Sequence, residues 1–458
     1  MTSQPQDSTL SKWLIHVEVR LKLRSSARYE TIKNAVYAHV TSYETLYIPS
    51  TLEGWKDVPE LADAVERIIV CESACPKSSL PVQEMAIQVH VYQPTDGDAF
   101  EEYGNNGGQQ GEEDETMAAT MCELPNQQYE GLWDSLIYAD NVKMKLLDYI
   151  QATLILSDAN IDYNLVSWNR VVLLHGPPGT GKTSLCRALA QKIAIRFSHR
   201  YSNARLLEIN SHSLFSKWFS ESGKLVQKLF SGITDLIEEE DGFVVVLIDE
   251  VESLTAARAG AMAGTEPSDG LRVVNALLTQ LDKLKHRKNV LIMATSNLVQ
   301  AIDSAFVDRA DIIQFVDLPS REAIYDILRS CLCEMTSKGV VAGTDVPSLA
   351  QVRLYGLLDE PSIEDESPQD RSNSTGKRLL SLATSCQLQG MSGRALRKLP
   401  VLALARYIGV GNVVLSHTAP SHPSGLLQGA PVEVWLNGLE RAVREQIEEK
   451  GKVNQEHK

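Results

Sequence analysis

The chain has 458 residues, of which 43% are hydrophobic and 22% are charged, and its formal net charge is −15. This length and composition are typical of a soluble protein with two to four domains. The acidic balance argues against a sequence-independent grip on DNA or RNA, which needs a surplus of Lys and Arg. It does not exclude a locally basic face.

The cysteines and the apolar runs indicate in which cellular compartment the protein is expected. The seven cysteines are scattered and odd in number, a pattern typical of reduced intracellular thiols rather than of a disulfide framework. The N-terminus has no apolar signal core, and no uninterrupted apolar run is long enough to span a bilayer. We therefore expect a cytosolic or nuclear protein that does not bind a membrane.

Residues 1–94 are predicted to form a small α+β domain. Leu14–Leu23 and Met85–Tyr92 alternate apolar and polar side chains, which predicts two half-buried strands. Between them, Val58–Ile69 has helical periodicity. We find no phosphate loop or metal cluster in this range, so the sequence favours a binding domain over a catalytic one.

Residues 95–125 are predicted to be an acidic flexible linker. Within it, Thr95–Thr116 is rich in Gly, Gln, Asn and acidic residues, including the run Glu112–Glu115. Too little apolar surface is present to offset the loss of chain entropy on folding. A functional acidic tract is the alternative interpretation.

Residues 126–318 are predicted to form a parallel sheet with flanking helices, because apolar runs alternate with helical patterns. Residues 319–458 are predicted to be mainly helical, with a polar insertion at 359–378. We expect strands of the sheet at Val171–Leu174, Leu206–Ile209, Phe243–Ile248, Val290–Ala294 and Ile312–Val316.

The most specific motif matches the phosphate-binding pattern G-x-x-x-x-G-K-[ST]. It comprises Gly176, Pro177, Pro178, Gly179, Thr180, Gly181, Lys182 and Thr183, followed by Ser184. A predicted strand precedes it and an amphipathic helix follows, so backbone N–H groups and the helix N-terminus converge on phosphate oxygens. Lys182 is expected to reach the β- and γ-phosphates, and the Thr183 hydroxyl is expected to hold Mg²⁺. The flanking elements disfavour a Gly-Pro-rich turn that matches by chance.

A second motif ends the apolar run Val244–Ile248 with the carboxylates of Asp249 and Glu250. Asp249 is predicted to fix Mg²⁺ through its water shell, because this cation prefers oxygen ligands. Glu250 is predicted to polarise a water for attack on the γ-phosphate. Carboxylates often end strands, so this pattern is weak alone but strong downstream of a phosphate loop.

Three further residues are candidates for the same site. Asn297 ends the next predicted strand and is expected to orient the attacking water, unless it serves as a turn former or helix N-cap. Arg309 is expected to contact the transferring phosphoryl group, and the alternative is a surface ion pair with a flanking aspartate. Arg394, with Ser392 as a predicted N-cap, could lean over the phosphates or be an exposed first-turn residue.

The order of these motifs resembles that of the AAA+ ATPases over about Gly131–Glu449. Between the motifs, four segments resemble the family of pachytene checkpoint protein 2 and thyroid hormone receptor-interacting protein 13. These segments are Glu208–Lys224, Leu254–Arg258, Ala263–Asp269 and Ser392–Pro400. The resemblance implies an α/β AAA+ module, with a parallel P-loop sheet, flanking helices and a small helical lid, behind a small α+β domain.

The resemblance also implies a function. Members of this family are homohexameric rings that use ATP and Mg²⁺ to unfold part of a HORMA-domain protein, converting closed forms to open ones. Their substrates are meiotic chromosome-axis HORMA proteins and the spindle-checkpoint HORMA protein, the latter through an adaptor. Nucleus and cytoplasm are then the expected locations. Alternatives are a nucleic-acid motor or clamp loader, which the acidic charge disfavours, a nucleotide-regulated scaffold and a small-molecule kinase.

Two segments acquire roles from this resemblance. Lys217, Trp218 and Phe219 match the first pore loop of the family, and Ala259–Gly270 would be the second. An exposed aromatic side chain can grip any peptide through apolar contact. The alternative is a helix core, which the polar neighbours disfavour. Many AAA+ members place two arginines near the subunit boundary, whereas only Arg309 is found there in this chain.

Overall fold

The computed structural model describes residues 12–73, 75–97, 101–102, 119–211, 222–253, 269–298, 302, 304–342, 346–355, 368–409 and 429–456. These residues form two units, each of which has its own core. The first unit comprises the described residues within 1–133, 142–175 and 183–314, and the second comprises those within 134–141, 176–182 and 315–458.

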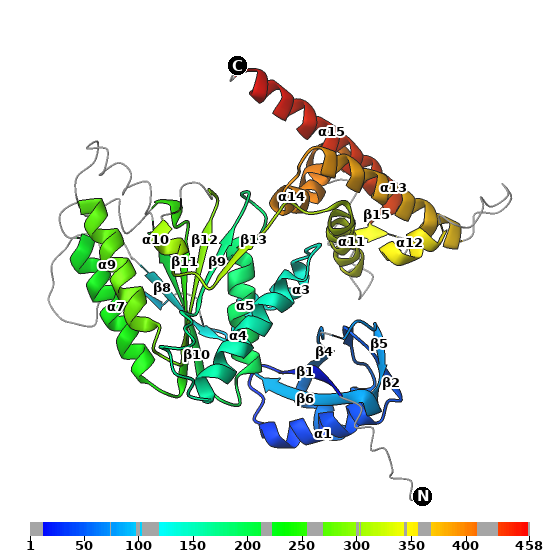
Figure 1. Ribbon diagram of the computed structural model, residues 1–458. Helices are drawn as coiled ribbons and strands as arrows, with labels where there is room; N and C mark the ends of the chain where they lie inside the picture. The colour runs from blue at the N-terminus through cyan, green and yellow to red at the C-terminus, as the bar shows by residue number, and fades with distance from the viewer. Residues whose placement is uncertain are drawn as a thin grey trace, which may run out of the picture. The chain divides into compact units, whose positions relative to one another are not determined.

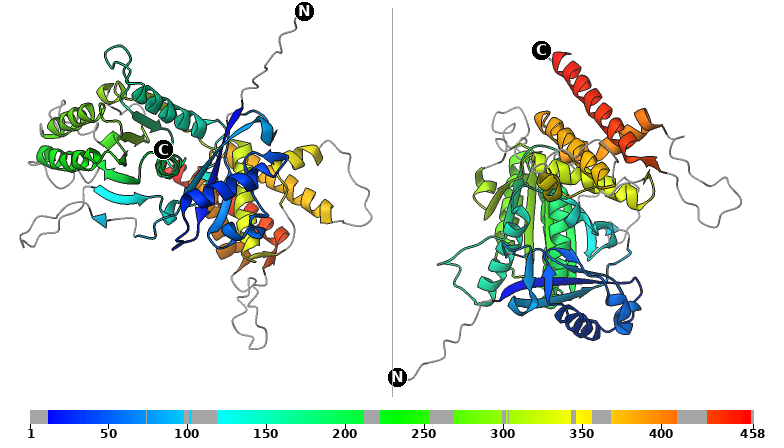
Figure 2. Two further views of the ribbon diagram at one scale, coloured as in Figure 1. Left: turned by 90° about the horizontal axis from the view of Figure 1, so that it is seen from below. Right: turned by 90° about the vertical axis from the view of Figure 1, so that its right-hand side faces the viewer.

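The first unit begins with a four-stranded sheet of order β3-β4-β1-β6, in which β1 pairs antiparallel with β4 and parallel with β6. Helix α1 (Tyr29–Thr41) packs on this sheet through Ile32, Val36 and Val40, spaced four residues apart (Figures 1 and 2). The other elements are β1 (Trp13–Leu21), β2 (Thr45–Tyr47), β3 (Ser50–Thr51), η1 (Trp55–Asp57), α2 (Pro59–Ala62), β4 (Val65–Val70), β5 (Ser79–Pro81), η2 (Val82–Glu84) and β6 (Met85–Tyr92). The predicted α+β domain and both of its predicted strands are confirmed.

The helix predicted over Val58–Ile69 is wrong beyond Ala62. Helix α2 is a single short turn, and β4 follows it. The β-branched residues Val65, Ile68 and Val70 are all buried, and β4 forms a ladder with β1. Long-range pairing with β1 therefore overrides a local pattern that is compatible with a helix.

The second sheet of the first unit has seven strands in the order β13-β9-β12-β11-β10-β8-β7. The central strands β9, β12, β11 and β10 pair in parallel, which confirms the predicted P-loop sheet. All five predicted strands are present. The strands are β7 (Glu101–Glu102), β8 (Ala119–Leu124), β9 (Val171–His175), β10 (Asn203–Asn210), β11 (Gly242–Asp249), β12 (Val290–Ser296) and β13 (Ile312–Phe315).

Strand β8 lies inside residues 95–125, the range predicted to be a linker, so that prediction needs a correction. β8 pairs antiparallel with β10 and extends the sheet. Ala119, Cys122 and Leu124 are buried, so the end of this range does supply apolar surface to the fold. The prediction rested on the average composition of 95–125, which residues 103–116 dominate. That average gave little weight to the short apolar segment that forms β8.

Helices cover both faces of the seven-stranded sheet (Figure 1). On one face, α7 and α9 pack through residues such as Phe230, Ile233 and Leu277 against Val246 and Ile292. On the other face lie α4 and α5, and α5 is the predicted helix behind the phosphate loop. The helices are η3 (Gln127–Tyr129), α3 (Leu132–Ser135), α4 (Val142–Asp158), α5 (Lys182–Arg196), α7 (Ser222–Glu238), α9 (Asp269–Leu284) and α10 (Ser304–Val307).

The second unit is mainly helical, as predicted for the lid. Its core contains Leu328, Leu396 and Trp435, which lie on three different helices. Its elements are α11 (Arg321–Ser337), β14 (Val341–Ala342), α12 (Leu349–Tyr355), α13 (Pro368–Leu388), α14 (Gly393–Ala403), a π-helical turn η5 (Leu404–Ile408), β15 (Ala430–Pro431) and α15 (Val432–Glu456). Among the described helices of the chain, none has the length and apolar character needed to span a bilayer.

The prediction of a polar loop at 359–378 is wrong from Pro368 onward, because these residues belong to α13. Thr375 is buried, and Arg378 forms a 2.8 Å ion pair with Glu440 of α15. These tertiary contacts hold a polar stretch in a helix that its composition alone does not predict.

Candidate nucleotide site

The ends of β11 and β12 and the start of α5 bring three oxygen-bearing side chains together at Asp249. Because β11 pairs in parallel with β12 at Ile248 and Ala294, the following residues Asp249 and Thr295 end neighbouring strands. The Thr183 hydroxyl donates to Asp249 Oδ1 at 2.9 Å, and the Thr295 hydroxyl donates to the same oxygen. Thr183 therefore lies in direct contact with the first predicted carboxylate.

This donor set fits a magnesium ion. Mg²⁺ is bound in proteins by one or two carboxylates together with hydroxyl, water and phosphate oxygens. Thr183 Oγ1 and Asp249 Oδ1 lie 2.9 Å apart, so one hard cation can be shared between them directly or through water. Thr183 and Asp249 are thus the residues that would hold Mg²⁺.

Glu250 has a left-handed backbone, with φ of 58°. This conformation is uncommon for a residue other than glycine and costs about 1 kcal/mol or more. Hydrogen bonds hold it, since its N–H donates to Thr295 Oγ1 at 3.3 Å and its carbonyl accepts from Ser211 and Ser253 at 2.8 and 2.9 Å. The side chain itself is exposed. The turn therefore presents a carboxylate to solvent immediately after the Asp249 carboxylate.

Asn297 follows β12 and is bound by Glu252. Both its backbone N–H and its Nδ2 donate to Glu252 Oε1, at 3.1 and 3.0 Å. Glu252 lies two residues beyond Glu250, so the Asn297 amide is anchored to the same turn that carries Glu250. This arrangement is compatible with a residue that orients a water beside that carboxylate.

Arg309 forms a bidentate ion pair with Asp282 of α9, with N···O distances of 2.9 and 2.8 Å. A third bond joins its Nη1 to the carbonyl of Ala305 at 2.6 Å. The flanking Asp311 instead accepts from the Tyr149 hydroxyl and from the backbone N–H of Asn169, just before β9. The sequence did not identify Asp282 as the partner, and the contact of Arg309 with a neighbouring subunit stays a prediction.

The phosphate loop, described within the second unit, folds back on itself through Lys182. The buried ammonium donates to the carbonyls of Gly176 and Pro177 at 2.8 and 2.9 Å, and the Thr180 hydroxyl donates to Pro177 at 3.0 Å. The Lys182 ammonium is therefore held by carbonyls of the same loop whose N–H groups bind phosphate oxygens in such motifs.

Two glycines of the phosphate loop are required because other atoms of the chain approach their Cα atoms closely. A Cβ at Gly176, where φ is 145°, would lie 2.2 Å from the carbonyl oxygen of Val316. A Cβ at Gly179, where φ is 79°, would lie 2.7 Å from Ser392 Oγ. Both positions combine a positive φ with contact to other backbone or side-chain atoms, so only glycine is accommodated.

The start of α14 lies against the same loop. Ser392 caps this helix, as predicted, by accepting from the N–H of Ala395 at 3.4 Å. The backbone N–H of Arg394 donates to the carbonyl of Gly179 at 3.2 Å. Arg394 is exposed and begins the helix directly beside the loop. Its predicted reach toward the phosphates is compatible with this position.

Four residues of the site were not singled out from the sequence. Thr295 and Ser211 follow from strand register, because each stands at the end of a strand next to β11. The sequence contains no comparable signal for Glu252 or Asp282. The role of Glu252 depends on where its side chain points after a turn, and that of Asp282 depends on which face of α9 it occupies. The predicted pore-loop residues Lys217, Trp218 and Phe219, and positions 259–268, lie outside the described residues.

Comparison with known proteins agrees with the order of these motifs. Residues 10–97 match the model of the TRIP13 N-terminal domain, and residues 172–318 match the ATPase family associated with various cellular activities (AAA). Residues 320–419 match the TRIP13-like, AAA+ ATPase lid C-terminal domain.

Whole-chain similarity extends over nearly the entire sequence. The chain is 44% identical over 445 residues to the pachytene checkpoint protein 2 homolog of Mus musculus, covering 96% of this chain and 95% of the relative. It is 45% identical over 406 residues to the homolog of Arabidopsis thaliana, covering 86% and 84%. The solved structure of C. elegans PCH-2 is similar with a TM-score of 0.69 and 32% identity, covering 95% of this chain and 100% of that chain. The chain belongs to the pachytene checkpoint protein 2 family of AAA+ ATPases.

Proposed function

We propose that this chain is an ATP-hydrolysing remodeller that acts as a homohexameric ring on HORMA-domain proteins, partly unfolding them and converting closed forms to open ones. The observation that carries the hydrolytic part is the Thr183–Asp249 contact beside the strained, exposed Glu250. The choice of substrate rests on family membership.

In the proposed reaction, the loop N–H groups and Lys182 bind the ATP phosphates, and Thr183 and Asp249 hold Mg²⁺. Bound Mg²⁺ would neutralise negative charge on the phosphate oxygens. Glu250 accepts a proton as the attacking water adds to the γ-phosphorus, and ADP leaves with the β-phosphate oxygen.

Three further residues assist this step in the proposal. Asn297, anchored by Glu252, orients the attacking water. Arg394 contacts the phosphates from the start of α14. Arg309 of a neighbouring subunit stabilises the transferring group, for which it would exchange its intramolecular partner Asp282.

The work of hydrolysis is proposed to reach the substrate through Trp218 in the central pore. The N-terminal domain would bind the substrate directly or through an adaptor protein. Such an activity places the chain in the meiotic recombination (pachytene) checkpoint and the spindle checkpoint, in the nucleus on meiotic chromosomes and in the cytoplasm.

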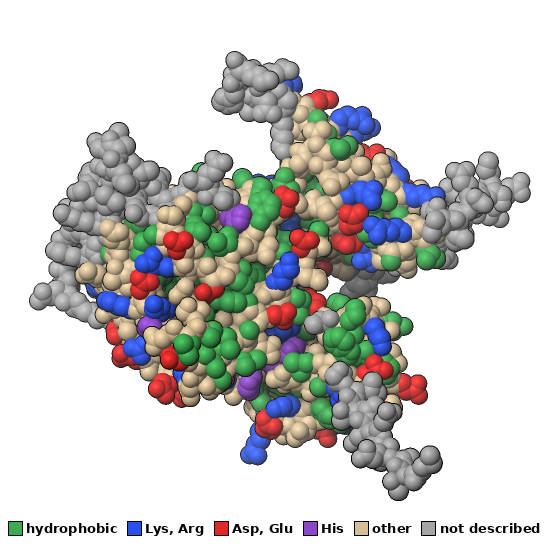
Figure 3. Space-filling view, in the orientation of Figure 1, with side chains coloured by type: hydrophobic (Ala, Val, Ile, Leu, Met, Phe, Trp, Pro, Cys, Tyr) green, Lys and Arg blue, Asp and Glu red, His purple; other side chains and the backbone are tan. Residues whose placement is uncertain are grey.

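The second candidate is a nucleic-acid motor or clamp loader of the same superfamily. The net charge of −15 disfavours it. On the face drawn in Figure 3, basic and acidic side chains are interspersed, without one continuous basic stripe. Direct nucleic-acid binding is therefore not part of the proposal.

The test uses the Glu250→Gln variant, which should bind ATP but not hydrolyse it and should therefore retain its substrate. Pull-down with a purified closed HORMA protein, with and without its adaptor, is expected to show ATP-dependent retention. The matched control is Glu240→Gln, on an exposed acidic residue before β11. Retention of duplex or single-stranded DNA without any retention of HORMA protein would favour the second candidate.

A further inference from the structure

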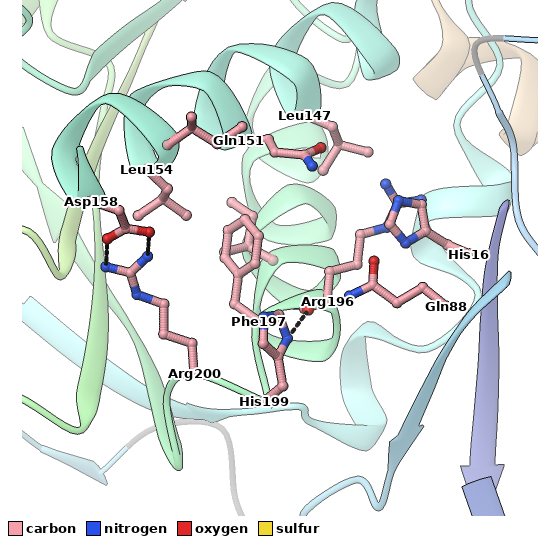
Figure 4. Close-up of a pocket in the computed structure, with 12 residues that line it drawn as sticks. His16, Gln88, Leu147, Gln151, Leu154, Asp158, Arg196, Phe197, His199 and Arg200 are labelled. Atoms are coloured by element: carbon pink, nitrogen blue, oxygen red, sulfur yellow. Dashed lines mark hydrogen bonds and ion pairs between the residues drawn. The ribbon is translucent and has the colours of Figure 1, made fainter. Parts of the chain in front are cut away.

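A cavity of about 170 Å³, partly open to solvent, lies in the first unit between the N-terminal sheet and the helices α4 and α5. Strands β1 and β6 contribute His16 and Gln88 to its wall, and the end of α5 contributes Arg196. Figure 4 shows Arg196 extending toward His16, with Gln88 beside it. The nucleotide motifs make no use of this cavity.

Arg196 is a buried cation with an incomplete set of partners. Its relative exposure is 7%, and among the described residues neither its Nε nor its Nη2 has a hydrogen-bond partner. The nearest carboxylate is Glu18, at 3.6 Å from Nε. Lys192 takes the other oxygen of that carboxylate at 2.7 Å. Glu18, Lys192 and Arg196 thus form a buried cluster with two cations and one anion.

Glu72 also acts electrostatically on Lys192, whereas the described residues that line the cavity offer Arg196 no further carboxylate partner. Arg200 and Asp158 compensate each other in a bidentate pair at 2.6 and 2.7 Å. His16 is neutral near pH 7, because burial first and Arg196 second lower its pKa to about 3. Its hydrogen-bonded neighbour His90 has a pKa lowered to about 4, mainly by burial. A surplus buried charge in low dielectric is costly unless it is paired.

We propose that this cavity binds a phosphate group, held by the guanidinium of Arg196 with Gln88 and His16 as neutral donors. A guanidinium matches two phosphate oxygens in a bidentate geometry. Donors reach the cavity from β1, β6 and α5, which suits the several oxygens of a tetrahedral anion better than the two of a carboxylate. The volume holds one such group with part of its hydration.

A bound phosphate would connect two parts of the first unit. His16 and Gln88 belong to the N-terminal sheet, whereas Arg196 ends α5, the helix that starts at the phosphate loop. An anion between them would strengthen the association of the substrate-binding domain with the ATPase sheet. Inorganic phosphate and phosphomonoesters share the required chemistry, so both belong in the test.

The experiment is a titration of the full chain with inorganic phosphate, and in a second arm with glycerol 3-phosphate, followed by calorimetry and thermal unfolding. A saturating non-hydrolysable ATP analogue with Mg²⁺ is present throughout, so that the γ-phosphate position of the nucleotide site is also filled. We expect saturable binding and a rise in Tm of a few degrees. Response to phosphate alone identifies the free anion as ligand, and response to both identifies phosphomonoesters as well.

The deciding variant is Arg196→Met, which keeps the length of the side chain and removes its charge. It should lose the phosphate response, while Arg205→Met, which removes a surface pair with Glu239, should keep it. Gln88→Ala, at a half-buried position, should weaken phosphate binding several-fold. This variant replaces Arg196→Met as the test if Arg196→Met fails to fold. An unchanged response in both cavity variants, or no saturable response in the wild type, overturns the proposal.

Discussion

Glu250 carries the largest share of the proposed chemistry and is held in an unfavourable backbone conformation. Its left-handed φ is maintained by Thr295 and Ser211. Strain retained in this way is common at catalytic positions, where the surrounding bonds over-determine the geometry. The turn that follows Asp249 therefore fixes the position of a carboxylate whose side chain remains accessible to water.

Replacement of Glu250 by Gln should lower kcat for ATP hydrolysis by about 100-fold or more, because the amide cannot accept the proton from water. The Kd for ATP should change by no more than about twofold, since the phosphate contacts lie elsewhere. Steady-state turnover and nucleotide-binding measurements check both. Near-wild-type turnover in Glu250→Gln, with Glu240→Gln as control, would show that the water-activating role is wrong.

Thr295 is expected to be a positioning residue for Asp249 and Glu250, because its hydroxyl donates to the first and accepts from the N–H of the second. Thr295→Val should lower kcat about tenfold and raise the Mg²⁺ concentration required for half-maximal rate. Thr295→Ser, which keeps the hydroxyl, should restore both. If Ser and Val behave alike, the hydroxyl has no positioning role.

Two residues that separate motifs nominate for the site lie together in the structure, whereas the partners of two others were not anticipated from the sequence. Thr183 and Asp249 follow from two linear motifs, and the structure joins them directly. The partner of Asn297 is Glu252 and that of Arg309 is Asp282, and both partners depend on side-chain directions set by tertiary packing. A pattern of residues along the sequence does not predict those side-chain directions.

At the scale of elements, α5 has a role at each end. Its first residues complete the phosphate motif, and its last turn supplies Lys192 and Arg196 to the buried cluster with Glu18 of β1. Burial alone would raise the pKa of Glu18, but Lys192 and Arg196 hold it below its ordinary value. The N-terminal sheet is thus attached to the helix of the nucleotide motif by ionised groups.

The histidines beside this cluster predict an acid-sensitive attachment. His16 and His90 have pKa values lowered to about 3 and about 4, so they stay neutral in the folded state while the unfolded chain takes up protons below about pH 6.5. The free energy of unfolding should therefore fall by about 2 kcal/mol per pH unit between pH 6.5 and 4.5, about half of it from each histidine. Glu18, with its lowered pKa, adds to the loss only at lower pH.

Denaturant unfolding at several pH values checks this dependence. The variant His90→Gln should flatten the slope, and His286→Gln, at an exposed position, should leave it unchanged. A slope that is equal in all three proteins contradicts the assignment to these histidines.

The prediction of strands and helices from the sequence succeeded where a long apolar run coincides with a central strand of the sheet. The parallel strands β9, β11 and β12 are continuous apolar runs, which is what burial on both faces requires. It failed at β4, at β8 and at the start of α13, where short or polar segments are held by distant partners. Those partners are set by the fold and are absent from any local window.

At the scale of the whole molecule, the proposed ring requires Arg309 to act on the ATP of a neighbouring subunit. Arg309→Ala alone should lower kcat about 1,000-fold or more. Glu250→Gln should form a hexamer-sized species with ATP by light scattering. A strict monomer would remove the role of Arg309 between subunits.

Mixing the two inactive variants tests that role directly. A ring with both kinds of subunit contains sites in which an intact Glu250 faces an intact Arg309 from its neighbour. Random mixing in equal amounts should restore about a quarter of the sites. If the mixture is as inactive as each variant alone, the two residues act within one subunit.

ATP hydrolysis by this chain is proposed to drive the opening of a HORMA-domain protein. The most direct measurement is release of a fluorescent partner peptide from a closed HORMA protein, with its adaptor present, on addition of ATP. We predict release with the wild-type chain and ATP, and none with Glu250→Gln or with ADP. Release at the same rate without hydrolysis, or no release by a wild-type chain that hydrolyses ATP, would contradict the proposed remodelling activity.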